Sequence, residues 1–242
     1  MVVFITSIGF IGHFLTKYFR NAKIEGIYLI SFFGSLVSST AVTVQLSERL
    51  KKEKDILNYF IPAILLSISV MLIRTMAIIL FIVRDIKYEL FLAPLLMFLV
   101  SIFFFLFYYS KHKKEKIKIN IDLGEKSPFE ILPALKFASI FVVILFIVFF
   151  MDKYFGDKGI YLTSFIVSII DSEAIIFSIL ESFKNGIFDI SLVSNLVSLI
   201  VVVNTFIKLL YIWLFAGKKY FLNIFTIILL VVFGGILGFF LV

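Results

Sequence analysis

Two acidic residues, Asp171 and Glu173, lie in the middle of a long apolar stretch and are separated only by Ser172. A carboxylate at mid-membrane depth is costly unless it is paired, protonated or ligated, so packing alone does not favour it. Carboxylate, hydroxyl and carbonyl oxygens are the ligands that hard cations such as Mg²⁺ and Na⁺ prefer. We therefore predict an ion-binding site here, with Asp171 and Glu173 as metal ligands and Ser172 beside them.

The spacing of the two acids leaves two geometries open. Residues two apart on a regular helix point about 200° away from each other, so these carboxylates cannot share one face. Either the helix is broken near residues 170–172 and exposes carbonyl oxygens beside both acids, or Asp171 lines the axis while Glu173 pairs elsewhere.

Three further polar residues, Arg74, Asn204 and Lys208, belong to apolar runs and complete the predicted intramembrane site. Lys208 lies near enough to one end of its run for its ammonium to reach the interface. Two acids and two bases balance, so a structural ion-pair network is one interpretation. In the other, Arg74 leaves a carboxylate when an ion or a proton binds.

The acidic segment belongs to a duplicated stretch of sequence. Residues 26–52 and 159–185 are identical at 11 of 27 positions, at a constant offset of 133 and without a gap. The residues of the first copy that align with the acidic segment are Ser38, Ser39 and Thr40. We include these hydroxyls in the predicted site, and we expect both copies to depart from regular helix geometry at these aligned positions. Arg74-Thr75 likewise aligns with Asn204-Thr205, so one half carries a base where the other carries an amide.

Each copy also carries a polar stripe, if its helix is regular. The stripe of the first copy comprises Ser31, Ser35, Ser38, Gln45 and Arg49, and that of the second Ser164, Ser168, Asp171, Ser178 and Ser182. Lipid does not solvate such stripes, so they are expected to face each other or a wet cavity.

The composition predicts an all-α, polytopic membrane protein, because 62% of the 242 residues are hydrophobic. Apolar runs of membrane length give eight spans: residues 2–19, 26–48, 57–83, 89–110, 132–151, 159–182, 188–215 and 219–242. We predict two tandem four-helix repeats, residues 1–110 and 132–242, joined by a polar linker at 111–131. Because four spans return the chain to its starting side, the repeats are expected to be parallel.

The loops on the side of both termini carry more Lys and Arg than the opposite loops, which favours a multi-pass cell-membrane protein with cytoplasmic termini. The formal net charge of +7 suits an anionic lipid surface, and no nucleic-acid partner is predicted. The expected partners are the lipid bilayer and an inorganic cation, and the sequence is compatible with a homo-oligomer. No cofactor is predicted apart from a bound Mg²⁺ or Na⁺.

Four segments, in order, resemble a known family. They are Gly34-Ser35-Leu36-Val37-Ser38-Ser39-Thr40-Ala41, Ser127-Pro128-Phe129-Glu130, Asp171-Ser172-Glu173-Ala174 and Asn204-Thr205 with Lys208. They are similar to the signatures of domain-of-unknown-function family 4010, which usually has Asp where this chain has Glu173. The family often follows an MgtC/SapB-type membrane domain, and this association implies a role in ion homeostasis.

These features predict a transporter or channel for Mg²⁺ or another hard cation, with proton coupling as an option and a site at mid-membrane between the two repeats. The alternative is a transporter of an anionic or lipid-like substrate, bound by Arg74 and Lys208, with the acids as proton couplers. An enzyme is not predicted, because the chain has no Cys and no metal-protease or nucleophile-elbow motif.

Overall fold

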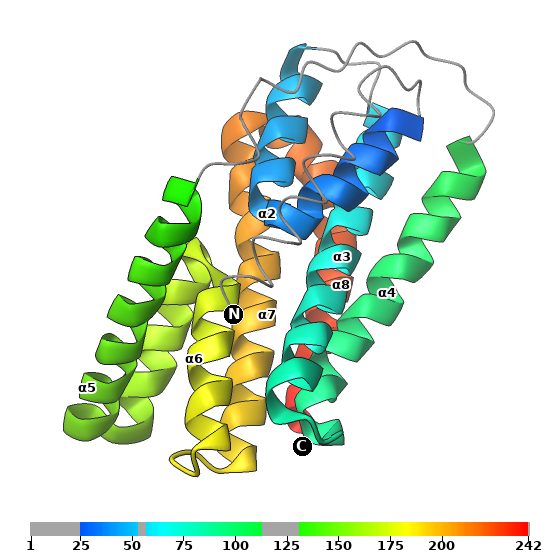
Figure 1. Cartoon of the computed structure of the whole chain (residues 1–242). Helices are drawn as coiled ribbons and strands as arrows, with labels where there is room; N and C mark the ends of the chain where they lie inside the picture. The colour runs from blue at the N-terminus through cyan, green and yellow to red at the C-terminus, as the bar shows by residue number, and fades with distance from the viewer. Residues whose placement is uncertain (1–24, 53–56, 113–130, 242) are drawn as a thin grey trace. The chain divides into compact units, whose positions relative to one another are not determined.

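A computed structural model describes residues 25–52, 57–112 and 131–241, and all regular structure in these ranges is helical (Figure 1). The helices are α2 (Glu25–Lys52), α3 (Leu57–Val83), α4 (Tyr88–His112), α5 (Ile131–Ile170), α6 (Ser172–Lys184), α7 (Ile190–Phe215) and α8 (Lys218–Phe240). The predicted all-α class is confirmed for these ranges. The first predicted span and most of the predicted linker lie outside the described residues.

Within the described ranges, five helices are long and apolar enough to cross a membrane: Ile27–Lys51, Leu57–Val83, Tyr88–Lys111, Ile190–Phe215 and Lys218–Phe240. Helix α4 exposes large apolar side chains such as Phe103, Leu106 and Phe107. An apolar surface of this kind is stable in contact with lipid hydrocarbon, so the protein is a membrane-embedded helical protein.

The fifth and sixth predicted spans are not two separate regular helices. The long α5 contains the fifth span and the start of the sixth, and it is interrupted at Gly156, whose φ of 56° and ψ of −147° are non-helical. This conformation is essentially restricted to glycine, because a Cβ would clash with the backbone. Figure 1 shows the chain reversing direction within α5. The sixth span is itself divided, since α5 ends at Ile170 and α6 starts at Ser172.

The chain forms two compact units whose boundaries cut through the helices. Unit 1 contains α2, α3 up to Met71, α4 from Leu99, α7 from Lys208 and α8 up to Ile228. Unit 2 contains α3 from Leu72, α4 up to Phe98, α5 from Leu132, α6, α7 up to Ile207 and α8 from Leu229. Along the chain, α3 passes from unit 1 to unit 2 and α4 returns, whereas α7 passes from unit 2 to unit 1 and α8 returns.

Each unit has its own packing contacts. In unit 1, Tyr28 on α2 makes edge-to-face contacts with Phe105 and Tyr109 on α4, with ring centroids 6.0 and 5.3 Å apart. In unit 2, α8 approaches α4 so closely that a Cβ on Gly238 would lie 2.5 Å from Ala93 Cα. Small residues permit such close helix packing in membranes, where dispersion contacts drive association.

Candidate functional site

Both copies of the duplicated stretch break their helix at the same aligned residue. Ser38 has φ −159° and ψ 110° inside α2, and Asp171 has φ −150° and ψ 107° between α5 and α6. Figure 1 shows the chain changing direction within α2 and between α5 and α6. The predicted departure from helix geometry is therefore confirmed in both copies, and it occurs at the first residue of each aligned triplet.

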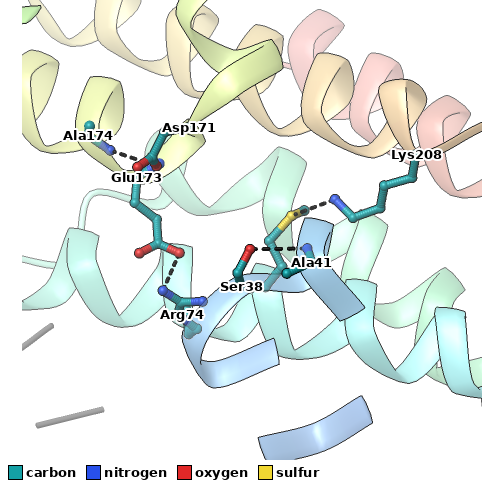
Figure 2. Close-up of polar contacts among 8 residues, drawn as sticks. Ser38, Ala41, Arg74, Asp171, Glu173, Ala174 and Lys208 are labelled. Atoms are coloured by element: carbon teal, nitrogen blue, oxygen red, sulfur yellow. Dashed lines mark hydrogen bonds and ion pairs between the residues drawn. The ribbon is translucent and has the colours of Figure 1, made fainter. Parts of the chain in front are cut away.

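Residue type explains why the helices break at these positions. Ser and Asp are strong N-cap residues, because a short side-chain oxygen can accept from the free backbone N–H groups of the next turn. The Ser38 hydroxyl accepts from Ala41 N at 3.2 Å. Asp171 Oδ1 accepts from Glu173 N at 2.9 Å and from Ala174 N at 3.3 Å (Figure 2). Each break is thus also the start of a capped half-helix.

The break at Asp171 also removes the usual helical donor of the Ser168 carbonyl near the end of α5. The Asp171 N–H still donates to Val167 O at 2.8 Å, but the extended backbone removes the next donor of the α5 ladder. The Ser168 carbonyl instead accepts from Asn204 Nδ2 of α7 at 2.9 Å. Asn204, predicted as a site residue, therefore contacts the carbonyl side of the break.

On the other side of the break, Glu173 forms an ion pair with Arg74 of α3 (Figure 2). The side chains of Arg74 and Glu173 are only 7% and 15% exposed. The two acids therefore have different partners: Glu173 pairs with a base, while Asp171 caps α6. Asp171 Oδ2 has no hydrogen-bond partner among the described residues.

The corresponding break in unit 1 is surrounded by hydroxyl groups. The Ser35 hydroxyl donates to Ser67 Oγ at 2.6 Å, and Ser67 Oγ lies 3.4 Å from the Ser39 carbonyl. Thr43 Oγ1 donates to the same carbonyl at 2.8 Å. Ser39 is buried and Thr40 half-buried, so this break is polar but carries no charge of its own.

The polar stripe predicted for α2 is correct before the break and wrong after it. Ser31 and Ser35 are fully buried, but Gln45 is exposed. The polar residues that are buried after the break are Ser39, Thr43 and Ser47. A regular helix was assumed in the prediction, whereas the extended Ser38 changes the phase of the following turns.

Lys208 lies in unit 1 and is fully buried, with Nζ 3.3 Å from Met71 Sδ (Figure 2). The position of Lys208 near one end of an apolar run allowed its ammonium to reach the interface. In the structure the ammonium does not extend to the protein surface. Lysine side chains are rarely fully buried, and ionisable residues within a membrane mark functional sites, so Lys208 is a residue of functional interest.

The structure groups the predicted site residues in two sets. Unit 2 contains Arg74, Asp171, Ser172, Glu173 and Asn204, and unit 1 contains Ser38, Ser39, Thr40 and Lys208. No cluster of three or more acidic or His side chains suited to a metal ion occurs in the described ranges. The assignment of Asp171 and Glu173 as metal ligands stays a prediction.

Two features were missed by the sequence analysis. Ser67 contacts both sides of the Ser38 break, but it is a single hydroxyl in an apolar run and no pattern distinguishes it. The second concerns Ser31 and Ser164, which belong to the predicted stripes: their hydroxyls are fully buried without a hydrogen-bond partner in the described part of the chain. The stripes predicted polar positions here but not the lack of partners.

Comparison with known proteins assigns the chain to a family. The sequence model described as "Domain of unknown function (DUF4010)" matches residues 3–216, which include both breaks. The chain belongs to the DUF4010 family. An uncharacterized protein of Aquifex aeolicus (strain VF5) is 30% identical over 193 residues, covering 80% of this chain and 84% of that protein. No solved structure matches the chain.

Proposed function

We propose that this DUF4010 protein is a membrane transporter for a small inorganic cation. The observation that carries the proposal is the aligned pair of helix breaks at Ser38 and Asp171. Helices interrupted within the membrane are typical of secondary transporters, where free half-helix ends and unwound carbonyls bind ions and substrates. The buried hydroxyls of Ser31 and Ser164, which have no hydrogen-bond partner among the described residues, also suit an interior that water or a ligand enters.

The charges in unit 2 favour a monovalent cation. Of the two acids at the break, Glu173 pairs with Arg74, so Asp171 is the one without a basic partner among the described residues, and its Oδ2 is available to a ligand. Mg²⁺ usually retains several waters and is bound through one or two carboxylates, together with substrate groups. A single such carboxylate beside the Ser172 hydroxyl and the Ser168 carbonyl better matches Na⁺ or a proton. We assign Asp171 and Ser172 as ligands and the Glu173–Arg74 pair as the coupling element.

We further infer that the two repeats are inverted rather than parallel. The loop between α3 and α4 and the loop between α6 and α7 belong to the same compact unit, although parallel repeats place them on opposite sides of the membrane. Helix α6 has 13 residues, or roughly 20 Å, which is shorter than a bilayer core of about 30 Å. We infer that the broken segments at residues 25–52 and 159–184 each turn back rather than cross. Together with the predicted span at residues 2–19, which lies outside the described residues, this gives each repeat an odd number of crossings. The total is then even, which places both termini on one side.

The alternative substrate class, a small anion, is favoured by one specific observation. Unit 1 contains both the fully buried Lys208 and the half-helix that starts after the uncharged Ser38. The N-terminus of a half-helix and a buried ammonium both attract negative charge. Under this alternative Asp171 and Glu173 act as proton couplers.

Flux into proteoliposomes tests the proposal, with Asp171→Asn as the variant and Asp189→Asn as the matched control. Asp189 caps α7 in the same manner, with Oδ1 accepting from Leu192 N at 2.7 Å, but it is exposed. Asn is also a good N-cap, so both variants keep the cap and lose only the charge.

We expect Asp171→Asn to lose Na⁺ or proton flux and Asp189→Asn to keep it. Full cation flux in a folded Asp171→Asn protein would contradict the proposal. If anion flux then disappeared in Lys208→Met, the anionic alternative would replace it.

A further inference from the structure

Asn204 contacts the Ser168 carbonyl, which the helix break at Asp171 deprives of its usual donor. In an unbroken helix Ser168 O would accept from the N–H of residue 172. With Asp171 extended, this carbonyl accepts from Asn204 Nδ2 at 2.9 Å instead. Asn204 is 3% exposed and Ser168 is fully buried, so water has little access to replace this hydrogen bond.

The repeat shows that this contact has a counterpart. Asn204 aligns with Arg74 at an offset of 130, and each residue is followed by Thr. Arg74 binds Glu173, three residues after Ile170, where α5 ends, and Asn204 binds Ser168, two residues before it. Aligned positions on α3 and α7 therefore hold the two sides of one break, one through charge and the other through a neutral amide.

The neutrality of Asn204 has a physical reason if a cation binds here. The carbonyl oxygens at the end of a helix carry partial negative charge and are ready ligands for a cation. A carbonyl oxygen has two lone pairs, so Ser168 O can accept from Asn204 and still contact an ion. A base at position 204 would repel that ion, whereas an amide orients the carbonyl without adding charge.

We infer that Asn204 is a positioning residue for the proposed cation site and that the Ser168 carbonyl near the end of α5 supplies a backbone ligand to the ion. The inference rests on the proposed function and deepens it. Ion selectivity then depends on how firmly this carbonyl is held, because a cation of the wrong radius requires it to move. Asn204 acts on affinity and discrimination through Ser168 and not through direct contact with the ion.

Cation binding to the purified full chain tests this inference. The melting temperature is measured during titration with NaCl, LiCl or KCl, with N-methyl-D-glucamine chloride keeping the ionic strength constant. A ligand that binds only the folded state raises the melting temperature, so the titration gives a half-saturating concentration. The variants are Asn204→Ala and the isosteric Asn204→Asp, and the control is Asn223→Ala at an exposed position on α8.

We expect Asn204→Ala to raise the half-saturating concentration of the preferred cation roughly three- to tenfold, the effect of losing one hydrogen bond, and to reduce discrimination among the three ions. Asn204→Asp loses the amide donor and should also lose discrimination, whereas Asn223→Ala should match the wild type. A purely structural role would lower the melting temperature without cation but leave the half-saturating concentrations unchanged, and this result would overturn the inference alone. Absence of stabilisation by all three ions in the wild type would overturn the inference, and absence of proton flux in the proteoliposomes as well would overturn the proposed function.

Discussion

Replacing Arg74 or Glu173 by Met should destabilise the protein strongly, while replacing both should not. The two side chains are 7% and 15% exposed, so each single substitution leaves a charge with little access to water. Stranding one member of a buried pair costs about 3–5 kcal/mol, whereas a well-packed apolar pair of similar volume is often neutral. Two independent effects would add to about 6–10 kcal/mol, so we expect the double variant to lose less than either single variant.

The measurement is a double-mutant cycle on unfolding free energies, obtained from reversible unfolding in mixed micelles and followed by circular dichroism. Lys219→Met is the control, because Lys219 is exposed at the start of α8 and its loss should cost no more than about 0.5 kcal/mol. Single variants that behave like Lys219→Met, or a double variant whose loss equals the sum of the singles, would refute the reasoning.

The same double variant separates the two interpretations of the ion pair. A structural pair can be exchanged for Met–Met without loss of transport, provided that the protein folds. A coupling pair cannot, because Glu173 must bind Arg74 in one state and release it in another. We expect the folded double variant to lose ion-driven transport, and normal transport would identify the pair as structural.

Two further predictions concern the course of the chain. The protein has no Cys, so single cysteines placed at Ile86, Ile187 and Lys218 can be labelled separately with a membrane-impermeant maleimide. Cysteines at positions 86 and 187 should react from one side of the membrane and a cysteine at 218 from the other. Labelling of positions 86 and 187 from opposite sides would support the parallel arrangement instead. Gly156→Ala should lower the unfolding free energy by about 1–3 kcal/mol, because Gly156 has a positive φ. Gly234→Ala is the control and should be neutral or slightly stabilising, because the added Cβ would lie at an ordinary 3.4 Å from Leu96. Equal melting temperatures of the two variants would contradict this prediction.

The helix breaks could be predicted because they follow from local chemistry. Ser38 and Asp171 are capping residues at aligned positions of a duplicated apolar segment, and acidic residues two apart are incompatible with one helix face. The partner of Glu173 could not be chosen in the same way. Arg74 and Lys208 were both available in the sequence, and only the packing of α3 against α6 distinguishes them.

Counting apolar residues does not determine how many times the chain crosses the membrane. An apolar run of membrane length predicts burial, and burial was correct for Ser35 and Ser168 in both copies. The run does not say whether the chain crosses the bilayer or turns back at a cap, because both courses remove the same side chains from water. The capping residue, Ser38 or Asp171, is what distinguishes a chain that turns back from one that crosses. A Ser or Asp in the middle of an apolar run therefore bears on how many times the chain crosses the membrane as well as on the proposed ion site. The inverted orientation that we propose for the two repeats depends on that number of crossings.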